Sequence, residues 1–362
     1  MASRFLPVND LQVHILEATP AGPPAPLVVL LHGFPELAYS WRKVLGPLAA
    51  AGFHAVAPDQ RGYGHTRPAA TADLASFRML NLAADIVALV HALGHESAAA
   101  VVGHDFGAAV AAHCALIRPD IFRSVVLMSA PFTGAPAVSP VPQLSHALAA
   151  LSPPRKHYTA YFASPHADQD MRHAPQGLHA FLRAYYHAKS ADAPGPPPHR
   201  LPDLSAPSLA QLPLYYVMHL DDSMPATVAR TAPSPAHVAA NTWLTEHELA
   251  VYTAVYADTG FQGGLNRYRC MLDPRWSDDL RVFARKKIDV PAMFLSGRQD
   301  WGVYQLPGAL EKVRAEACAS MREEDVVLID GAGHWVQQEK PDAVVECLIA
   351  FLNRQQRSID VM

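Results

Sequence analysis

The chain has 362 residues, of which 50% are hydrophobic and 17% charged, so it can bury a large core and its composition does not indicate disorder. Its formal net charge of −4 is too small to indicate a nucleic-acid or anionic membrane partner. The N-terminus lacks the pattern of a signal peptide, and no apolar run approaches the roughly 20 residues of a membrane-spanning helix. Four scattered cysteines without CxxC spacing favour reduced thiols over a metal site. We therefore expect a cytoplasmic protein with no membrane span, no nucleic-acid partner and no metal.

Short apolar runs alternate with segments of helical periodicity at both ends of the chain. Runs such as 27–31 (LVVLL) are apolar at every position, which is typical of strands buried on both faces of a parallel sheet. Strands that alternate with helices imply right-handed crossovers and a mostly parallel, doubly wound sheet of the α/β class. The expected strands are 25–31, 53–57, 98–103, 124–130, 292–296 and 325–330, and the expected helices are 80–93, 108–117 and 341–353.

The middle of the chain, residues 132–288, differs from both ends. It has few strand-like runs, many Tyr and His residues, and Pro-rich stretches that indicate loops, because proline fixes φ and supplies no amide donor. Helical segments are expected at 176–189 and 244–257. We interpret this region as a mainly helical cap inserted between two parts of one α/β core, residues 1–131 and 289–362.

Residues 103–107 (GHDFG) lie between an expected strand and an expected helix. A sharp strand-to-helix turn needs small residues on either side, because the central residue is strained and exposes its side chain. Here that residue is Asp105. A carboxylate nucleophile needs no base at neutral pH and forms an alkyl ester, which suits displacement at a saturated carbon of an epoxide or an alkyl halide. The alternative is that Asp105 only caps the following helix.

Hydrolysis of such an ester requires a base for water and an acid that orients the base. His334 lies in 331–335 (GAGHW), directly after an expected strand, in a glycine-rich loop that can present its ring at the end of the sheet. Asp300, after the strand 292–296, would bond that ring and stabilise the imidazolium. Asp330 competes for this role but is too close to His334 on the same turn. Any one of 19 histidines can be a surface or core residue, and Asp300 can be a loop or capping aspartate.

Donors for the developing oxyanion are expected from two backbone amides. Residues 32–36 (HGFPE) follow the strand 27–31, and their loop can point the Phe34 amide into the site. Together with the Phe106 amide it would form an oxyanion hole. Taken alone, the loop could be an ordinary Gly-Pro turn.

These motifs, in this order, resemble the epoxide hydrolases of the α/β-hydrolase fold superfamily. The resemblance covers nearly the whole chain and is carried by 32–36, 57–68 (APDQRGYGHTRP), 103–107, the Asp300 loop and 331–335. It implies an α/β-hydrolase fold with an inserted cap, a small-molecule epoxide as partner, and no cofactor. The first and last motifs also occur in related dehalogenases and esterases.

The resemblance also implies two cap tyrosines that bind the epoxide oxygen and protonate it as the ring opens. Residues 263–269 (GGLNRYR) place Tyr268 in the matching position. Residues 157–162 (HYTAYF) match with Tyr158, and Tyr161 lies one helical turn away. A phenol suits this role because it is neutral at pH 7 and can donate to an alkoxide. The alternative is that these tyrosines are packing residues of the cap.

Pro35 and Trp335 are expected to bind substrate. The chain departs from the family pattern at Phe106, where many members have Trp, and in the long Pro-rich stretch 190–213, which can reshape the pocket entrance. The oxyanion hole needs only the backbone amide of Phe106, so the reaction should tolerate this change. The Pro-rich stretch can alter which substrates enter.

Four rival functions are weaker. A haloalkane dehalogenase uses ring or amide donors for the halide, and Phe106 has no side-chain N–H; a fluoroacetate dehalogenase would want Arg at positions 106 and 109, which are Phe106 and Ala109. An ester hydrolase would want Ser or Cys at position 105. A non-catalytic binding protein on this scaffold remains a different class, which activity loss in Asp105→Ala with the fold retained would exclude. The sequence fixes neither the epoxide, the selectivity nor the oligomeric state, for which a homodimer is one expectation.

Overall fold

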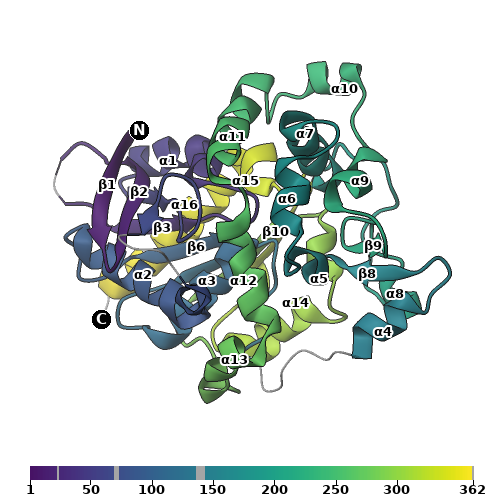
Figure 1. Ribbon diagram of the computed structural model, residues 1–362. Helices are drawn as coiled ribbons and strands as arrows, with labels where there is room; N and C mark the ends of the chain where they lie inside the picture. Colours follow the sequence, from purple (N-terminus) through teal and green to yellow (C-terminus); the bar gives the residue numbers. More distant parts are fainter. Residues whose placement is uncertain (23, 69–72, 136–142, 361–362) are drawn as a thin grey trace.

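A computed structural model describes the whole chain except residues 23, 69–72, 136–142 and 361–362 (Figure 1). Its core is one sheet whose strands run in the order β1-β2-β4-β3-β6-β7-β10-β11, with β5 beside β2. The pairs on the β4-to-β11 side are parallel, whereas β1–β2 and β2–β4 are antiparallel. The strands are β1 (Ala2–Val8), β2 (Leu11–Ala18), β3 (Leu27–Leu31), β4 (His54–Pro58), β5 (Arg67–Pro68), β6 (Ala100–His104), β7 (Val125–Met128), β10 (Ala292–Gly297) and β11 (Val326–Ile329).

Helices cover both faces of this sheet, and the alternation of side chains along the strands explains why. In β3, Leu27, Val29 and Leu31 pack in the cluster that contains α2 and α3. Val28 and Leu30 point the other way and pack with α1 and α16. A strand that is buried on both faces must be apolar at every position, as the sequence indicated. The core helices are α1 (Arg42–Ala50), α2 (Met79–Ala92), α3 (Phe106–Ile117), α14 (Ala309–Lys312), α15 (Val336–Glu339) and α16 (Pro341–Asp360).

Between β7 and β10 the described chain is mainly helical, and these helices gather on one side of the sheet (teal and green in Figure 1). A small antiparallel pair, β8 (Arg155–His157) with β9 (Val217–His219), was not expected from the sequence. Residues 136–142 of the predicted cap lie outside the described residues. The helices of this region are α4 (Gln143–Ala149), α5 (Tyr158–Phe162), α6 (Ala167–Arg172), α7 (Leu178–Lys189), α8 (Ala206–Leu209), α9 (Met224–Ala229), α10 (Pro235–Ala240), α11 (Glu246–Thr259), α12 (Gln262–Leu272) and α13 (Pro274–Ser277).

Helix boundaries follow local capping rather than the apolar period alone. The helix expected at 244–257 is α11, two residues later, because the Thr245 side chain accepts from the Glu248 amide and the Glu248 carboxylate accepts from the Thr245 amide. Gly260, with φ of 64°, ends it. Short 3₁₀ helices connect other elements at Ala38–Trp41, Leu74–Phe77, Asp278–Phe283, Trp301–Tyr304 and Glu323–Asp325, and a π-helical turn lies at Val313–Ala317.

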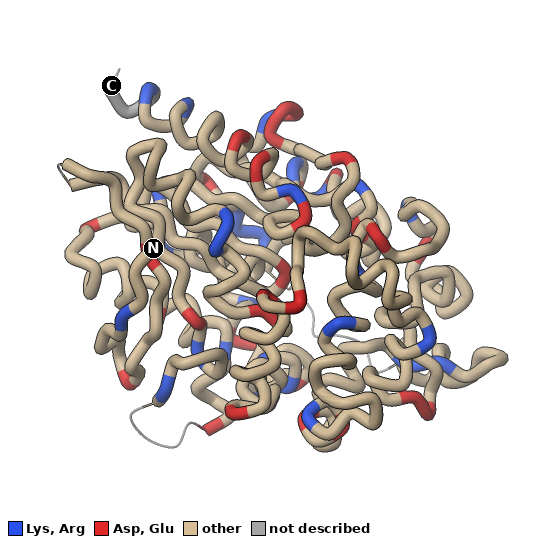
Figure 2. The backbone as a smooth tube through the Cα atoms, turned by 90° about the horizontal axis from the view of Figure 1, so that it is seen from above, with Lys and Arg blue, Asp and Glu red and all other residues tan. Residues whose placement is uncertain are grey.

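Charged residues of both signs are interspersed along the described chain (Figure 2). All four cysteines are free thiols. Within the described residues, no helix combines the length and apolar character needed to cross a membrane.

Candidate active site

Asp105 sits on the sharp turn between β6 and α3, with φ of 53° and ψ of −118°. This left-handed conformation is strained for a residue with a Cβ and is typical of a side chain held out for function. The turn presses against the loop after β3. A Cβ on Gly107 would lie 2.3 Å from the Leu31 carbonyl oxygen, and one on Gly33 would lie 2.4 Å from Asp105 Cβ. Glycine is therefore required on both sides of the contact.

The structure brings Asp105, His334 and Asp300 together. His334 Nε2 lies 3.2 Å from Asp105 Oδ2, and His334 Nδ1 lies 3.1 Å from Asp300 Oδ2. Asp300 is held in turn, because the Gly302 amide donates to its Oδ1 at 2.7 Å and the Ser296 hydroxyl donates to its Oδ2 at 3.2 Å. His334 and Asp300 are almost completely buried. The ring is thus fixed with Nδ1 on one carboxylate and Nε2 toward the other.

Asp330, the competing acid, is placed elsewhere. Its side chain is exposed and forms an ion pair with Arg298. It therefore has no contact with the histidine ring that would let it serve as the orienting carboxylate.

The two carboxylates, Asp105 and Asp300, and the His334 ring between them stabilise one another's ionised forms. Burial acts to raise the pKa of Asp105, but the hydrogen bond from His334 and the charge of Lys189 lower it below the usual value. Burial and the charge of Lys189 act to lower the pKa of His334, but Asp300 and Asp105 raise it above the usual value. Burial likewise acts to raise the pKa of Asp300, which His334 lowers. Asp105 is therefore a carboxylate at neutral pH.

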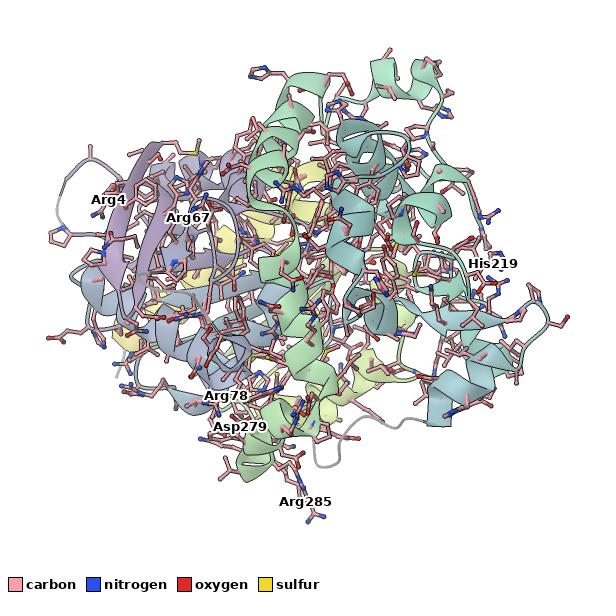
Figure 3. The ribbon with its side chains drawn as sticks, in the orientation of Figure 1. Arg4, Arg67, Arg78, His219, Asp279 and Arg285 are labelled. Carbon is pink, nitrogen blue, oxygen red and sulfur yellow. The ribbon has the colours of Figure 1, made fainter. Side chains whose placement is uncertain are left out.

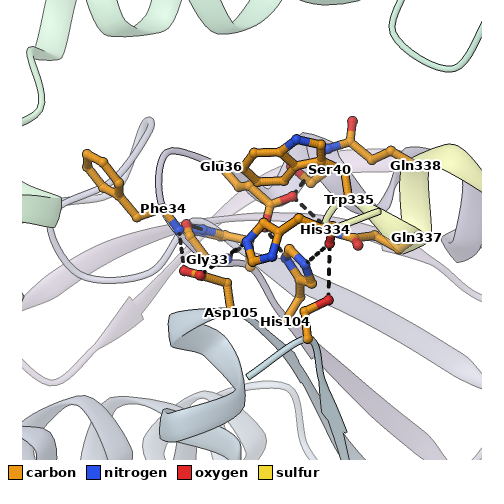
Figure 4. Close-up of polar contacts among 12 residues, drawn as sticks. Gly33, Phe34, Glu36, Ser40, His104, Asp105, His334, Trp335, Gln337 and Gln338 are labelled. Carbon is orange, nitrogen blue, oxygen red and sulfur yellow. Dashed lines mark hydrogen bonds and ion pairs between the residues drawn. The ribbon is translucent and has the colours of Figure 1, made fainter. Parts of the chain in front are cut away.

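The predicted oxyanion hole has one donor in place. The Phe34 amide donates to Asp105 Oδ1 at 3.1 Å (Figure 4). Phe106 is the first residue of α3, where a backbone N–H has no acceptor within the helix. Pro35 is buried beside this loop, and its carbonyl oxygen accepts from the Tyr186 hydroxyl at 2.8 Å.

The two predicted cap tyrosines face each other near the turn. The ring centroids of Tyr158 and Tyr268 are 6.1 Å apart, and the Phe106 ring lies 4.4 Å from that of Tyr268. Burial raises the pKa of both hydroxyls, so they remain protonated at neutral pH. Tyr161, the alternative, donates its hydroxyl to Asp170 at 3.1 Å. Tyr158 is accordingly the better candidate.

A buried network under His334 was not found from the sequence (Figure 4). Glu36 Oε2 lies 2.5 Å from His104 Nδ1, and His104 Nε2 donates to the His334 carbonyl oxygen at 2.7 Å. Gln337 and Gln338 donate to the other carboxylate oxygen, Oε1, at 2.8 and 3.2 Å. The network fixes the backbone that carries the histidine ring. The sequence motif at residues 32–36 indicates a role only for the Phe34 amide, because the residues that bond Glu36 are distant in the chain.

Lys189 is a second residue that the sequence did not single out. It is 5% exposed, and its ammonium lies over three aromatic rings, 5.7 Å from Tyr185, 5.4 Å from Tyr216 and 5.1 Å from Trp335. Burial lowers its pKa, although nearby carboxylates oppose this. Trp335, predicted to bind substrate, is fully buried and donates its indole N–H to the Tyr186 carbonyl oxygen at 2.7 Å. It packs between the cap and the core rather than at an accessible surface.

The histidine loop is bonded directly to the end of α7. The His334 amide donates to the Lys189 carbonyl oxygen at 2.9 Å. Nearby, one carboxylate oxygen of Glu339 accepts from the amides of Ala191 and Gly333 at 2.8 and 2.9 Å. Burial raises the pKa of Glu339 to about 7. These contacts join the cap to the core at the loop that carries His334.

The Pro-rich stretch lines a cavity of about 380 Å³ beside this joint. Residues 193–198 form part of its wall, together with Tyr215, Gln299 and Trp301. Trp301 follows Asp300 in the chain, whereas Asp105, His334 and Asp300 are not among the lining residues, so the effect of this stretch on access stays a prediction.

Comparisons with known proteins agree with this fold and geometry. The family described as alpha/beta hydrolase fold matches residues 26–341. Epoxide hydrolase A of Mycobacterium tuberculosis is 35% identical over 356 residues, covering 96% of each chain, and an epoxide hydrolase of Caballeronia sordidicola is 32% identical, covering 98% of this chain and 93% of its own. The solved epoxide hydrolase from an endophytic Streptomyces has a TM-score of 0.77 at 32% identity and covers 98% of this chain and 96% of its own.

The chain therefore belongs to the alpha/beta hydrolase fold family and, within it, to the epoxide hydrolases. The predicted fold class and the predicted resemblance are both confirmed.

Proposed function

We propose that this protein adds water to a hydrophobic epoxide and releases a vicinal diol through a covalent ester on Asp105. The observation that carries the proposal is the placement of His334, whose Nε2 lies 3.2 Å from Asp105 Oδ2 while Nδ1 is held by Asp300. A base fixed against the nucleophile's own carboxyl group is suited to hydrolyse an ester formed there.

In the first step, Tyr158 and Tyr268 hold the epoxide oxygen and an Asp105 oxygen attacks one ring carbon. A carbon–oxygen ester bond forms, the ring carbon–oxygen bond breaks, and one tyrosine gives its proton to the departing alkoxide. Burial, which raises the pKa of both phenols, keeps that proton in place until the alkoxide develops.

In the second step, His334 removes a proton from water, and the water oxygen attacks the carboxyl carbon of Asp105. The Phe34 and Phe106 amides donate to the oxyanion, and Asp300 stabilises the imidazolium. The ester carbon–oxygen bond then breaks, the departing alkoxide takes the second proton of the water from the new carboxylic acid of Asp105, and the diol leaves the Asp105 carboxylate behind. The proton held by His334 restores the tyrosine, so the cycle closes without a cofactor.

The names of the relatives support the reaction, since the similar proteins are epoxide hydrolases. The preference for a hydrophobic epoxide rests on the aromatic side chains around Tyr268, which include Phe34, Phe106 and Phe162.

Isotope labelling tests the covalent step. In a single turnover of styrene oxide in ¹⁸O-water, both diol oxygens should be unlabelled, because the new one comes from Asp105, and the label should appear on Asp105 itself. Label in the diol on the first turnover would mean direct attack by water and would refute the ester. Parallel assays with a chloroalkane and a p-nitrophenyl ester should give little turnover, and Asp105→Ala should lose diol formation while keeping its fold.

A further inference from the structure

A second cavity, of about 530 Å³, lies beside the active site; we call it the flank cavity. Its wall is formed by α3, α12, α13 and the segments next to them, and its lining does not include Asp105. Exposed residues Asp278, Arg281 and Leu306 form its rim, whereas buried residues Arg267 and His113 line its interior. Its volume lies in the range of about 300–1,000 Å³ that is usual for small-molecule sites.

Arg267 is the unusual member of this lining. Its side chain lies against the Phe106 ring, with the guanidinium carbon 4.5 Å from the ring centroid, and the residue is 8% exposed. Nη1 donates to the Met79 sulfur at 3.6 Å, and Nε has no hydrogen-bond partner among the described residues. Stacking covers one face of the guanidinium but leaves its in-plane N–H groups without strong acceptors. Burial lowers the pKa of Arg267 to about 10, so it is still a cation at neutral pH.

The acidic residues nearest to the rim are paired with other arginines. Asp278 lies 3.5 Å from Arg281, and Asp279 lies 3.9 Å from Arg78, although neither carboxylate oxygen of Asp279 has a hydrogen-bond partner among the described residues. Figure 3 shows Arg78 and Asp279 next to each other at the lower edge of the molecule, close to α13. Within the described part of the chain, Arg267 has no carboxylate at ion-pair distance, and the nearby charge of Asp105 offsets only part of the effect of burial. A buried cation without a carboxylate partner is rare in proteins, because desolvation is then uncompensated.

Two more buried polar atoms in the lining have no partner among the described residues, Trp276 Nε1 and His113 Nε2. His113 Nδ1 donates to the Ala109 carbonyl oxygen at 2.7 Å, and burial lowers the pKa of His113 to about 4. His113 is therefore neutral at pH 7 with Nε2 as an acceptor. The indole of Trp276 offers a donor, as Arg267 does. The rest of the wall includes apolar side chains such as Phe77 and Leu280.

We propose that the flank cavity binds an organic carboxylate with an apolar chain, whose carboxylate group accepts hydrogen bonds from Arg267. Such a ligand supplies the acceptors and the negative charge that the cavity interior lacks, and its chain matches the apolar wall toward the rim. Arg267 and Tyr63 also line a space of about 10 Å³, which has room for about one water and not for this ligand. The site does not depend on the proposed epoxide chemistry.

Binding of decanoate and of its neutral counterpart decanamide, measured by calorimetry on the full chain, tests the proposal. Decanoate should bind at one site about 10- to 100-fold more tightly than decanamide, the range for a charged hydrogen bond. Equal binding of the two, or no binding of decanoate, would overturn the proposal.

Two variants locate the ligand. Arg267→Met should weaken decanoate about 10- to 100-fold and leave decanamide unchanged, and Arg267→Lys should restore part of the difference. Ala109→Leu, which adds bulk to the cavity wall and keeps Arg267, should weaken both ligands. Unchanged decanoate binding in Ala109→Leu would place the ligand elsewhere and refute the site, even if Arg267→Met does not fold. Circular dichroism of each variant provides the folding control.

The carboxylate could belong to the substrate or to a separate fatty acid, and turnover separates these sources. If 10,11-epoxyundecanoate is hydrolysed with a higher kcat/KM than its methyl ester, and Arg267→Met removes the difference, the substrate's own carboxylate occupies the cavity. If the two are hydrolysed equally and decanoate does not compete with either, while still binding through Arg267, the ligand is a separate acid. A preference for the acid that survives in Arg267→Met would count against the proposal.

Discussion

Replacing Asp300 by Asn should invert the tautomer of His334 while leaving the shape of the site unchanged. The Gly302 amide donates to Asp300 Oδ1 at 2.7 Å, so the single amide oxygen of Asn is held at that position. Its NH₂ group then occupies the place of Oδ2, 3.1 Å from His334 Nδ1, where the Ser296 hydroxyl can accept from it. Although Oδ1 also lies 3.2 Å from Nδ1, an N–H group at the shorter contact favours the tautomer in which Nδ1 is unprotonated. The proton moves to Nε2, which can no longer accept one from water.

The expected effect falls on one step only. Loss of the correct tautomer in a histidine–aspartate pair lowers the rate by about 10⁴-fold, equivalent to ~5.5 kcal/mol in the barrier. This should slow hydrolysis of the ester, whereas attack by Asp105 needs no base and should change little. Asp300→Asn should therefore accumulate the alkyl-enzyme.

Rapid quench followed by intact-protein mass spectrometry would measure this. With styrene oxide, nearly the whole population of Asp300→Asn should gain the mass of the substrate, while the unaltered protein shows a small fraction. Asp330→Asn is the matched control, since Asp330 is exposed and pairs with Arg298, and its rates should not change. Ester hydrolysis within about tenfold of normal in Asp300→Asn would refute the tautomer reasoning.

Three further outcomes are expected. As pH falls through the raised pKa of His334, its Nε2 becomes protonated while Asp105, with its lowered pKa, stays ionised. The ester should therefore accumulate at low pH in quench experiments. Absence of the ester at low pH would contradict the assignment of His334 as the base. Tyr158→Phe should lower the rate of ring opening about 10- to 100-fold in single-turnover assays, with Tyr161→Phe as the control that stays close to normal. Thr245→Ala should lower the free energy of unfolding by about 1 kcal/mol in denaturant titrations without altering turnover, because it removes only the cap of α11.

Four of the residues that the sequence predicted for the site, Phe34, Asp105, Asp300 and His334, share one property: each lies in the turn or loop directly after a parallel strand, whereas Tyr158 and Tyr268 lie on cap helices. The carboxyl ends of parallel strands meet at one edge of a sheet, so chain order and strand pattern suffice to bring Asp105, Asp300 and His334 together. The Phe34 amide is reached by the same reasoning, because its loop follows β3.

Other features depend on tertiary packing and leave no local signal. The antiparallel pair β1–β2 has an exposed, irregular pattern in β1 that does not stand out in the sequence. Glu36 bonds side chains about 300 residues away, such as Gln337, and no short-range pattern marks that contact. Lys189 and Arg267 look like ordinary surface cations in a sequence, and only their burial distinguishes them. Tyr158 was already the better match to the motif in the sequence, and the hydrogen bond from Tyr161 to Asp170 agrees with that choice.

The hydrogen bond between the His334 amide and the Lys189 carbonyl oxygen limits how far the cap can move relative to the core. Lifting the C-terminal end of α7 away from the core would pull on the loop that carries the base and disturb its alignment with water. Movements that admit substrate and release product should therefore leave this bond in place, as displacement of the Pro-rich segment 193–198 or of the flank-cavity wall at α13 would. Amide hydrogen exchange should then be slow at the α7 joint and faster in those two segments. Variation introduced to broaden the substrate range belongs in those segments, since the joint fixes the geometry on which each proton transfer depends.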